Sequence, residues 1–265
     1  MKYAVYVEGK AEILFVADVL AKYSAYDAEK VGFQCINLNA DTYQYVPFPA
    51  QGSPEVSAAF YQLVNVNNDG RVISKLRKDI PNLLRQGFEI IIGLRDVFGD
   101  DYKALCGNQD INPALIRQMH ALQTEQLQKA GTADVRLHYA VMEYETWMMA
   151  LLSNFVSSRG KHLPDLLRQI GIDPEADLEQ TVFHPYNKVQ EIYRALGESY
   201  GKHEGDHLSF LSTLTKDDYE SLRNSGKCAS FKTFLDSLMT SRAYSTISED
   251  VRAESPAPPS LGCKP

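Results

Sequence analysis

The chain has 265 residues, of which 44% are hydrophobic and 23% are charged, and its net charge is −7. This length and composition suit one large globular domain, or one domain with a smaller appendage. No apolar run is long enough to cross a membrane, and the negative charge argues against indiscriminate coating of DNA. An enzyme acting on nucleic acids is not excluded, because a carboxylate cluster that holds Mg²⁺ itself adds negative charge.

The cysteines and the start of the chain bear on its location. The first residues enter an apolar segment at once, without the basic and small-residue features of a signal peptide. The cysteines form no CxxC pair, which favours reduced thiols. We therefore expect a cytoplasmic protein with no membrane partner. The four cysteines are Cys35, Cys106, Cys228 and Cys263.

Hydrophobic runs alternate with segments of helical periodicity over residues 1–157. This alternation predicts the α/β class, with a mostly parallel sheet flanked by helices. Residues 39–70 break the pattern with prolines and tyrosines, and we interpret most of them as a long loop or insertion. We also expect Pro81 to kink or restart its helix. In chain order, the predicted elements are strand 1–8, helix 11–23, strand 31–38, short strand 61–66, helix 72–86, strand 88–95, loop 101–111, helix 113–130, strand 135–142 and helix 143–155.

The strand signal fades after residue 158. The apolar spacing from there to residue 242 predicts a helical C-terminal part that completes the site of the first domain. Residues 243–265 are rich in Pro and Ser and have little to bury, so we expect a disordered tail. The predicted helices are 163–170, 187–196, 208–214, 217–223 and 230–239.

Acidic residues follow three of the predicted strands. Glu8 follows the first strand, Asp96 follows a second, and Glu143 and Glu145 follow a third. Ligand sites in α/β proteins lie at the carboxyl ends of parallel strands, so these acids would meet if their strands are neighbours. Carboxylate oxygens are the ligands that Mg²⁺ prefers, and two or three can hold it against a substrate phosphate. The pattern therefore predicts a site for Mg²⁺ or Mn²⁺.

Each acidic residue also has a plainer interpretation. A single acid at a strand end is more often a helix cap or a solvated loop residue, and Asp100 lies in an ordinary Gly-Asp-Asp loop. Glu12 lies one turn into its helix, where it could face solvent. His203 and His207 are four residues apart, but Gly205 between them disfavours a helical zinc pair. The prediction of a metal site therefore depends on the combination of acids.

The order of these motifs resembles the TOPRIM fold. The motifs are Glu8-Gly9-x-x-Glu12, a hydrophobic strand leading into Asp96-x-x-Gly99, and Glu143-x-Glu145. Topoisomerases, bacterial primases, the overcoming-lysogenization-defect nucleases and the maturase of 5S ribosomal RNA share that fold. The resemblance is closer to an uncharacterised bacterial TOPRIM-like family of phage-defence gene clusters. Later segments that resemble this family's signatures are His184–Lys188, Tyr200–Gly205 and Cys228–Phe231 with Phe234–Leu235.

The resemblance implies a Rossmann-like TOPRIM sheet and a metal-dependent nuclease that cleaves phosphodiester bonds in DNA or RNA. It also implies an effector of anti-phage defence that acts with a partner ATPase. Glu8 would serve as a metal ligand or general acid/base, and Lys202, rather than Lys188, would steady the phosphate in the transition state. The other implied metal ligands are Glu12, Asp96, Asp100, Glu143 and Glu145.

One motif departs from the wider fold, in which an Asp-x-Asp pair follows the second acidic strand. Here Val97 and Phe98 follow Asp96, and the next acid is Asp100. The site could thus hold one metal rather than two, or the chain could be a catalytically silent interaction module that binds a partner ATPase. A phosphoacceptor signalling domain fits less well, because it needs adjacent acids after the first strand. The choice between DNA and RNA, and a homo-oligomeric state, stay open.

Overall fold

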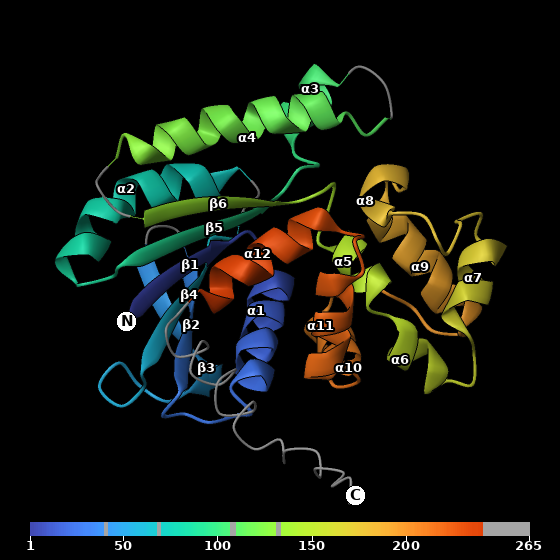
Figure 1. Cartoon of the computed structure of the whole chain (residues 1–265), viewed down its shortest axis with the longest axis horizontal. Helices are drawn as coiled ribbons and strands as arrows, with labels where there is room; N and C mark the ends of the chain where they lie inside the picture. The colour runs from blue at the N-terminus through green and yellow to red at the C-terminus, as the bar shows by residue number, and fades with distance from the viewer. Residues whose placement is uncertain (40–41, 68–69, 107–109, 131–133, 241–265) are drawn as a thin grey trace, which may run out of the picture.

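A mixed six-stranded sheet forms the centre of the protein, with strand order β3-β2-β4-β1-β5-β6 (Figure 1). The computed structural model describes residues 1–39, 42–67, 70–106, 110–130 and 134–240. All neighbouring strands are parallel except β3, which runs antiparallel to β2 at one edge. The predicted tail 243–265 lies outside the described residues. The strands are β1 (Lys2–Val7), β2 (Val31–Asn39), β3 (Thr42–Gln51), β4 (Ala59–Asn65), β5 (Ile90–Asp96) and β6 (Asp134–Ala140).

Helices cover both faces of this sheet, which confirms the predicted α/β class with a mostly parallel sheet. Side chains alternate between the two faces along β1 and β5, and each face feeds its own hydrophobic cluster. Helices α1 and α12 pack on one face, and α2 and α4 pack on the other. The helices of this part are α1 (Lys10–Tyr23), α2 (Arg71–Arg85), α3 (Asp100–Leu105) and α4 (Pro113–Gln128).

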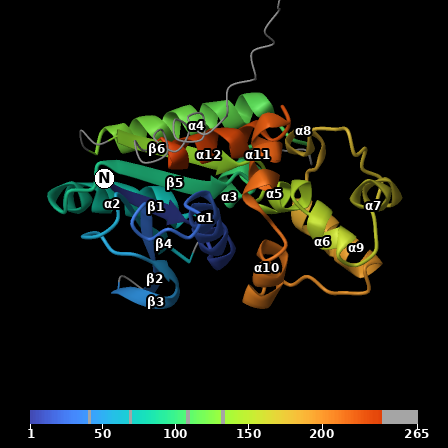
Figure 2. The ribbon, with the colours of Figure 1, turned by 60° about the horizontal axis from the view of Figure 1, so that its bottom comes forward.

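The remaining helices form the C-terminal part, and those from α5 to α9 gather beside the carboxyl ends of the parallel strands (Figures 1 and 2). Phe15 of α1 joins this part to the sheet, because its ring packs against Tyr144, Tyr219 and Phe231. One hydrophobic cluster therefore runs from the sheet into the C-terminal helices. These are α5 (Glu145–Ala150), α6 (Ser153–Ser157), α7 (Leu163–Gln169), α8 (Leu178–Thr181), α9 (Pro185–Ala195), α10 (Glu204–Leu211), α11 (Lys216–Asn224) and α12 (Ala229–Met239).

The prediction of a loop over most of residues 39–70 was partly wrong, because strand β3 occupies residues 42–51. This strand contains prolines at positions 47 and 49, which a sheet tolerates at its edge. Its register against β2 shifts between Gln34 and Cys35. The short strand expected at 61–66 is confirmed as β4.

Three local expectations also changed. Helix α2 continues through Pro81 without a restart, since Leu76, Ile80 and Leu83 anchor it on the sheet. A short helix, α3, replaces the first part of the loop expected at 101–111. The single helix expected at 143–155 consists of two short helices, α5 and α6, and Glu143 precedes the first of them.

None of the helices in the described part of the chain combines the length and apolar composition needed to cross a bilayer.

Candidate active site

Three strands that end in acids lie side by side in the sheet. Strands β1, β5 and β6 are consecutive and parallel, so their carboxyl ends share one edge. Glu8 follows β1, Asp96 ends β5, and Glu143 and Glu145 follow β6, while Glu12 lies in the first turn of α1. We call these five residues the carboxylate cluster. The sequence predicted all five members, but the order of the strands that brings them together comes from the structure.

Asp96 lies at the centre of this cluster. Burial raises the pKa of its carboxyl, and the nearby charges of Glu12, Glu8 and Glu145 raise it further. The backbone N–H of Tyr144 donates a hydrogen bond of 2.9 Å to Asp96 Oδ1 and fixes its orientation. The fold thus holds like charges together at an electrostatic cost, which is common at functional sites.

Glu145 is the most deeply buried acid of the cluster, with 1% of its side chain exposed. Its Oε1 accepts a hydrogen bond of 2.9 Å from the Tyr200 hydroxyl and lies 2.9 Å from Lys202 Nζ. Its Oε2 has no hydrogen-bond partner among the residues that the structure describes. A buried carboxylate oxygen without a donor is costly, so this atom is suited to a cation.

Lys202 enters the cluster from the C-terminal part and has a left-handed backbone conformation, with a φ of 58°. The side chain of Asp206 accepts backbone hydrogen bonds from Gly201 and His203 and so fixes the turn around it. Burial lowers the pKa of the Lys202 ammonium, but Glu145 and Glu143 outweigh this effect, so its pKa is raised. The ammonium therefore stays charged over the physiological range.

Glu143 and Lys188 occupy different surroundings. Glu143 Oε1 lies 3.7 Å from Lys202 Nζ, and its Oε2 accepts a hydrogen bond of 3.1 Å from the backbone of Tyr186. Burial raises the pKa of Glu143, and Glu145 adds to the effect. Lys188 instead bonds the carbonyl of Ile170 and pairs with Glu191 on α9. Of the two lysines considered from the sequence, Lys202 is the one at the cluster.

Arg95 is a site residue that the sequence reasoning missed. Strand alternation places Arg95 and Glu8 toward α2 and α4, and Asp96 toward α1. The Nε atom of Arg95 lies 3.6 Å from Glu8 Oε1, and both side chains are only 4% exposed. A cation directly before Asp96, in an otherwise apolar strand, was the available signal.

Three further residues considered from the sequence, Asp100, His203 and His207, are not members of the cluster. Asp100 is exposed in the first turn of α3 and lines a neighbouring cavity. His207 is buried, with its ring packed against Tyr200 and Tyr144, whereas His203 is exposed at the start of α10. Glu12, for which an exposed position was considered, is buried. The two histidines therefore do not form a zinc pair in this arrangement.

The cluster matches Mg²⁺ in donor type and in charge. It contains five carboxylates and two nearby cations, Arg95 and Lys202. However, no three His, Cys, Asp or Glu side chains in the described ranges are already arranged to hold a metal ion. Glu8 is held toward Arg95 and Glu145 toward Lys202. Metal binding would therefore require these glutamates to turn from their ion pairs.

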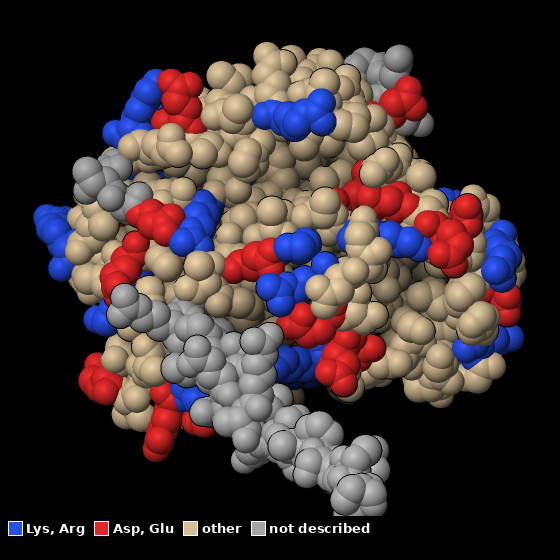
Figure 3. Space-filling view, in the orientation of Figure 1, with Lys and Arg blue, Asp and Glu red and all other residues tan. Residues whose placement is uncertain are grey.

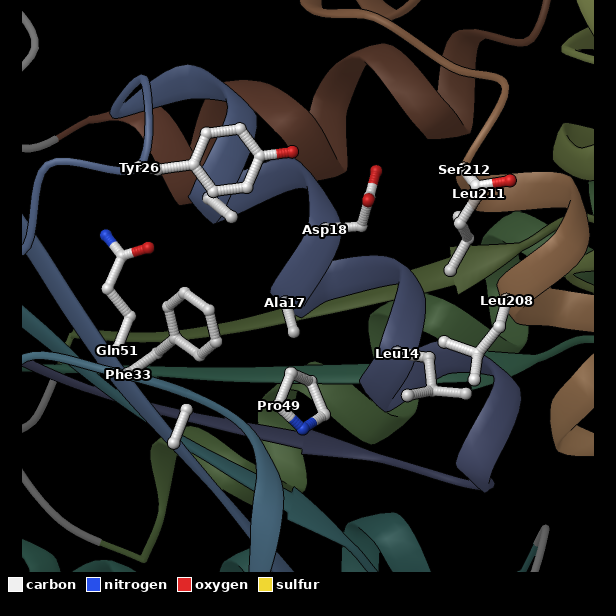
Figure 4. Close-up of a pocket in the computed structure, with 12 residues that line it drawn as sticks. Leu14, Ala17, Asp18, Tyr26, Phe33, Pro49, Gln51, Leu208, Leu211 and Ser212 are labelled. Atoms are coloured by element: carbon white, nitrogen blue, oxygen red, sulfur yellow. The ribbon is translucent and has the colours of Figure 1, made fainter.

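A second cavity lies between α1, the β2–β3 edge and α10, and has a volume of about 310 Å³ (Figure 4). Its walls are mainly apolar, including Leu14, Phe33 and Leu208. Asp18 is its charged residue, and the carboxylate accepts hydrogen bonds from Lys22 and Tyr219. This cavity lacks the converging acids of the carboxylate cluster.

Comparison of the chain with protein-family models, curated proteins and solved structures gave no match. What the carboxylate cluster can do therefore follows from its own residues and geometry.

Proposed function

We propose that the chain is a TOPRIM-like, metal-dependent nuclease that hydrolyses phosphodiester bonds in DNA or RNA. The observation that supports this most strongly is the meeting of acids from three adjacent strand ends with Lys202 from the C-terminal part. Acids alone could be structural, but a lysine whose ammonium points among them adds the group that phosphate chemistry needs.

The side chains have distinct roles in this proposal. Bound Mg²⁺ or Mn²⁺ would activate water and neutralise charge on the phosphate. Glu8, Glu12, Asp96 and Glu145 would hold the ion, and Glu8 could also accept a proton from the attacking water. Lys202 would lie beside the developing negative charge, and its raised pKa keeps it cationic.

The surface fits a subunit that is brought to its substrate. On the face seen in Figure 3, acidic and basic side chains are interspersed in small groups. Mixed charge of this kind gives little non-specific attraction to nucleic acid. We therefore extend the proposal to a cytoplasmic anti-phage effector that a partner ATPase delivers or restrains.

A cleavage assay tests the proposal. Purified chain would be incubated with Mg²⁺ or Mn²⁺ and supercoiled plasmid, linear DNA or total RNA. We expect cleavage of one of these substrate classes that chelator abolishes and that Asp96→Ala and Glu8→Ala each reduce by at least about 100-fold. Cleavage that persists in both variants would contradict the proposed site.

A second candidate is a catalytically silent interaction module that binds a partner ATPase. The ion pairs of Glu8 with Arg95 and of Glu145 with Lys202 favour it, since they already neutralise part of the cluster. Calorimetry with Mn²⁺ separates the two candidates. A nuclease awaiting its partner would bind Mn²⁺ in a manner that Asp96→Asn abolishes, whereas a silent module would bind none.

A further inference from the structure

A polar cavity of about 480 Å³ adjoins the carboxylate cluster on its α2 and α4 side. Arg95 lines this cavity and also contacts Glu8, so the same side chain borders both spaces. The other lining residues are Asn67, Gly70, Gly99, Asp100, Asp101 and Lys103. Its walls come from the segment after β4, from the end of β5 and from helix α3, at the same sheet edge as the acids.

The Arg95 guanidinium is buried yet keeps hydrogen-bonding capacity. Its Nη1 donates a hydrogen bond of 3.2 Å to Gln123, but its Nε has no hydrogen-bond partner within the described part of the chain. Gly99 leaves room beside it, since a Cβ at that position would lie 3.1 Å from Nη2. Although Nε faces Glu8 across 3.6 Å, the Nη2 side beside Gly99 remains for a ligand, and a planar guanidinium is suited to the oxygens of a phosphate.

Two other features of the cavity favour an anion. Helix α2 begins directly after Gly70, has 15 residues and carries no acid in its first turn. Its amino end therefore contributes partial positive charge to the cavity. Lys103 supplies a second cation at the cavity wall.

Three acids of the described residues oppose this attraction: buried Glu8, which lies 3.6 Å from Arg95 Nε, and exposed Asp100 and Asp101. Asp101 is 67% exposed, and its Oδ2 lies 4.0 Å from Arg95 Nη1. Asp100 is exposed as well. Solvent screens exposed charges more strongly than buried ones. Glu8 faces the Nε atom of Arg95, so a ligand inside the cavity would meet the Nη atoms of the guanidinium.

We propose that this cavity binds a phosphate group of the nucleic-acid substrate, next to the phosphate that is attacked at the carboxylate cluster. Arg95 would grip it with two parallel hydrogen bonds, and Lys103 would add attraction. The identity of the substrate rests on the proposed nuclease function, whereas the binding of a phosphate by this cavity can be measured without any cleavage.

Calorimetric titration of the full chain with pyrophosphate tests the inference, once in EDTA and once in Mg²⁺. We expect the dissociation constant for pyrophosphate to rise about tenfold or more in Arg95→Lys, which keeps the charge but loses the planar pair of N–H donors. Lys103→Met should weaken binding about threefold. Arg117→Lys, at an exposed arginine on α4, is the matched control and should leave binding unchanged.

Several results would overturn this site. They are an absence of pyrophosphate binding by the natural chain in both media, or unchanged affinity in both Arg95→Lys and Lys103→Met. If Arg95→Lys fails to fold, the affinity of Gly99→Ala for pyrophosphate is measured in its place, together with that of Lys103→Met. The Cβ that Gly99→Ala adds would press on Arg95 Nη2. Arg95-dependent pyrophosphate binding without cleavage of any nucleic acid would uphold the cavity and refute the nuclease. Cleavage that is unaffected by a folded Arg95→Lys, with unchanged pyrophosphate affinity, would refute the cavity alone.

Discussion

Replacing Asp96 by Asn should make the metal-free protein more stable. The substitution removes a carboxylate that faces the like charges of Glu8, Glu12 and Glu145 and the single opposite charge of Lys202. It keeps an oxygen that can accept the hydrogen bond from the Tyr144 backbone. The change therefore relieves repulsion while it preserves the contact that orients the side chain.

The size of the effect follows from the charges around Asp96. Of the three like charges, Lys202 offsets one, and removing the repulsion from the other two suggests a gain in the free energy of unfolding on the order of 2 kcal/mol at pH 8. For a protein of this length, that is a rise in melting temperature of about 4–8 °C. A carboxyl with a raised folded-state pKa destabilises the fold as pH rises through and above its usual value of 3.8. The difference between variant and natural chain should thus be small near pH 4 and grow toward pH 8.

Thermal unfolding in EDTA would measure the relief of repulsion, and thermal unfolding in Mg²⁺ would measure the part that Asp96 plays in metal binding. At a Mg²⁺ concentration one hundred times its dissociation constant, the free energy of unfolding of the natural chain should rise by about 2.7 kcal/mol, and that of Asp96→Asn should rise little. Asp173→Asn is the matched control, because exposed Asp173 also accepts a backbone hydrogen bond of 2.9 Å. An Asp96→Asn variant that is less stable in EDTA, or that gains as much from Mg²⁺, would refute the reasoning.

Two further comparisons use paired variants. Lys202→Met should lower the rate of cleavage by about 100- to 1000-fold, since it removes the cation beside the proposed phosphate. Lys188→Met should leave the rate within about twofold of that of the natural chain. Equal losses of rate in steady-state assays would contradict the assignment of Lys202 to the site. Gly93→Ala should lower the free energy of unfolding by about 1–3 kcal/mol, because its Cβ would lie 2.7 Å from Leu76 Cδ1. Gly205→Ala, in a helix with open space around it, should raise that energy by about 0.5–1 kcal/mol. Urea denaturation measures both glycine variants, and an unchanged Gly93→Ala would mean that the core repacks at no cost.

Sequence patterns predicted the parts of the site that local chemistry determines. Strands β1 and β5 are short, mainly apolar runs, β6 alternates polar and apolar residues, and the acids after these segments mark where each strand leaves the core. Glu8 and Asp96 could therefore be placed at strand ends before the sheet was known. The adjacency of those strands could not, because pairing between distant segments depends on tertiary contacts that leave no local signal.

The remaining features depend on packing. Buried side chains surround α1 on most sides, so Glu12 is buried where an isolated amphipathic helix would expose it. The prolines of strand β3 led to the prediction of a loop. A sheet tolerates them here because β3 lies at its edge. Arg95 was not predicted as a site residue. The alternation of side chains along a strand tells which face of the sheet Arg95 is on only when the helices that cover each face are known.

The long separation of Lys202 from the acids affects how the protein is made. The members of the carboxylate cluster lie within the first 145 residues, so a ribosome completes them well before Lys202 emerges. Helices α10 to α12 then share the hydrophobic cluster with α1, and their docking accompanies the delivery of this lysine. An unfinished or truncated polypeptide would carry the acids without their ammonium partner. For the proposed nuclease, this order of assembly would keep an incomplete chain from cleaving nucleic acid while it is still being synthesised.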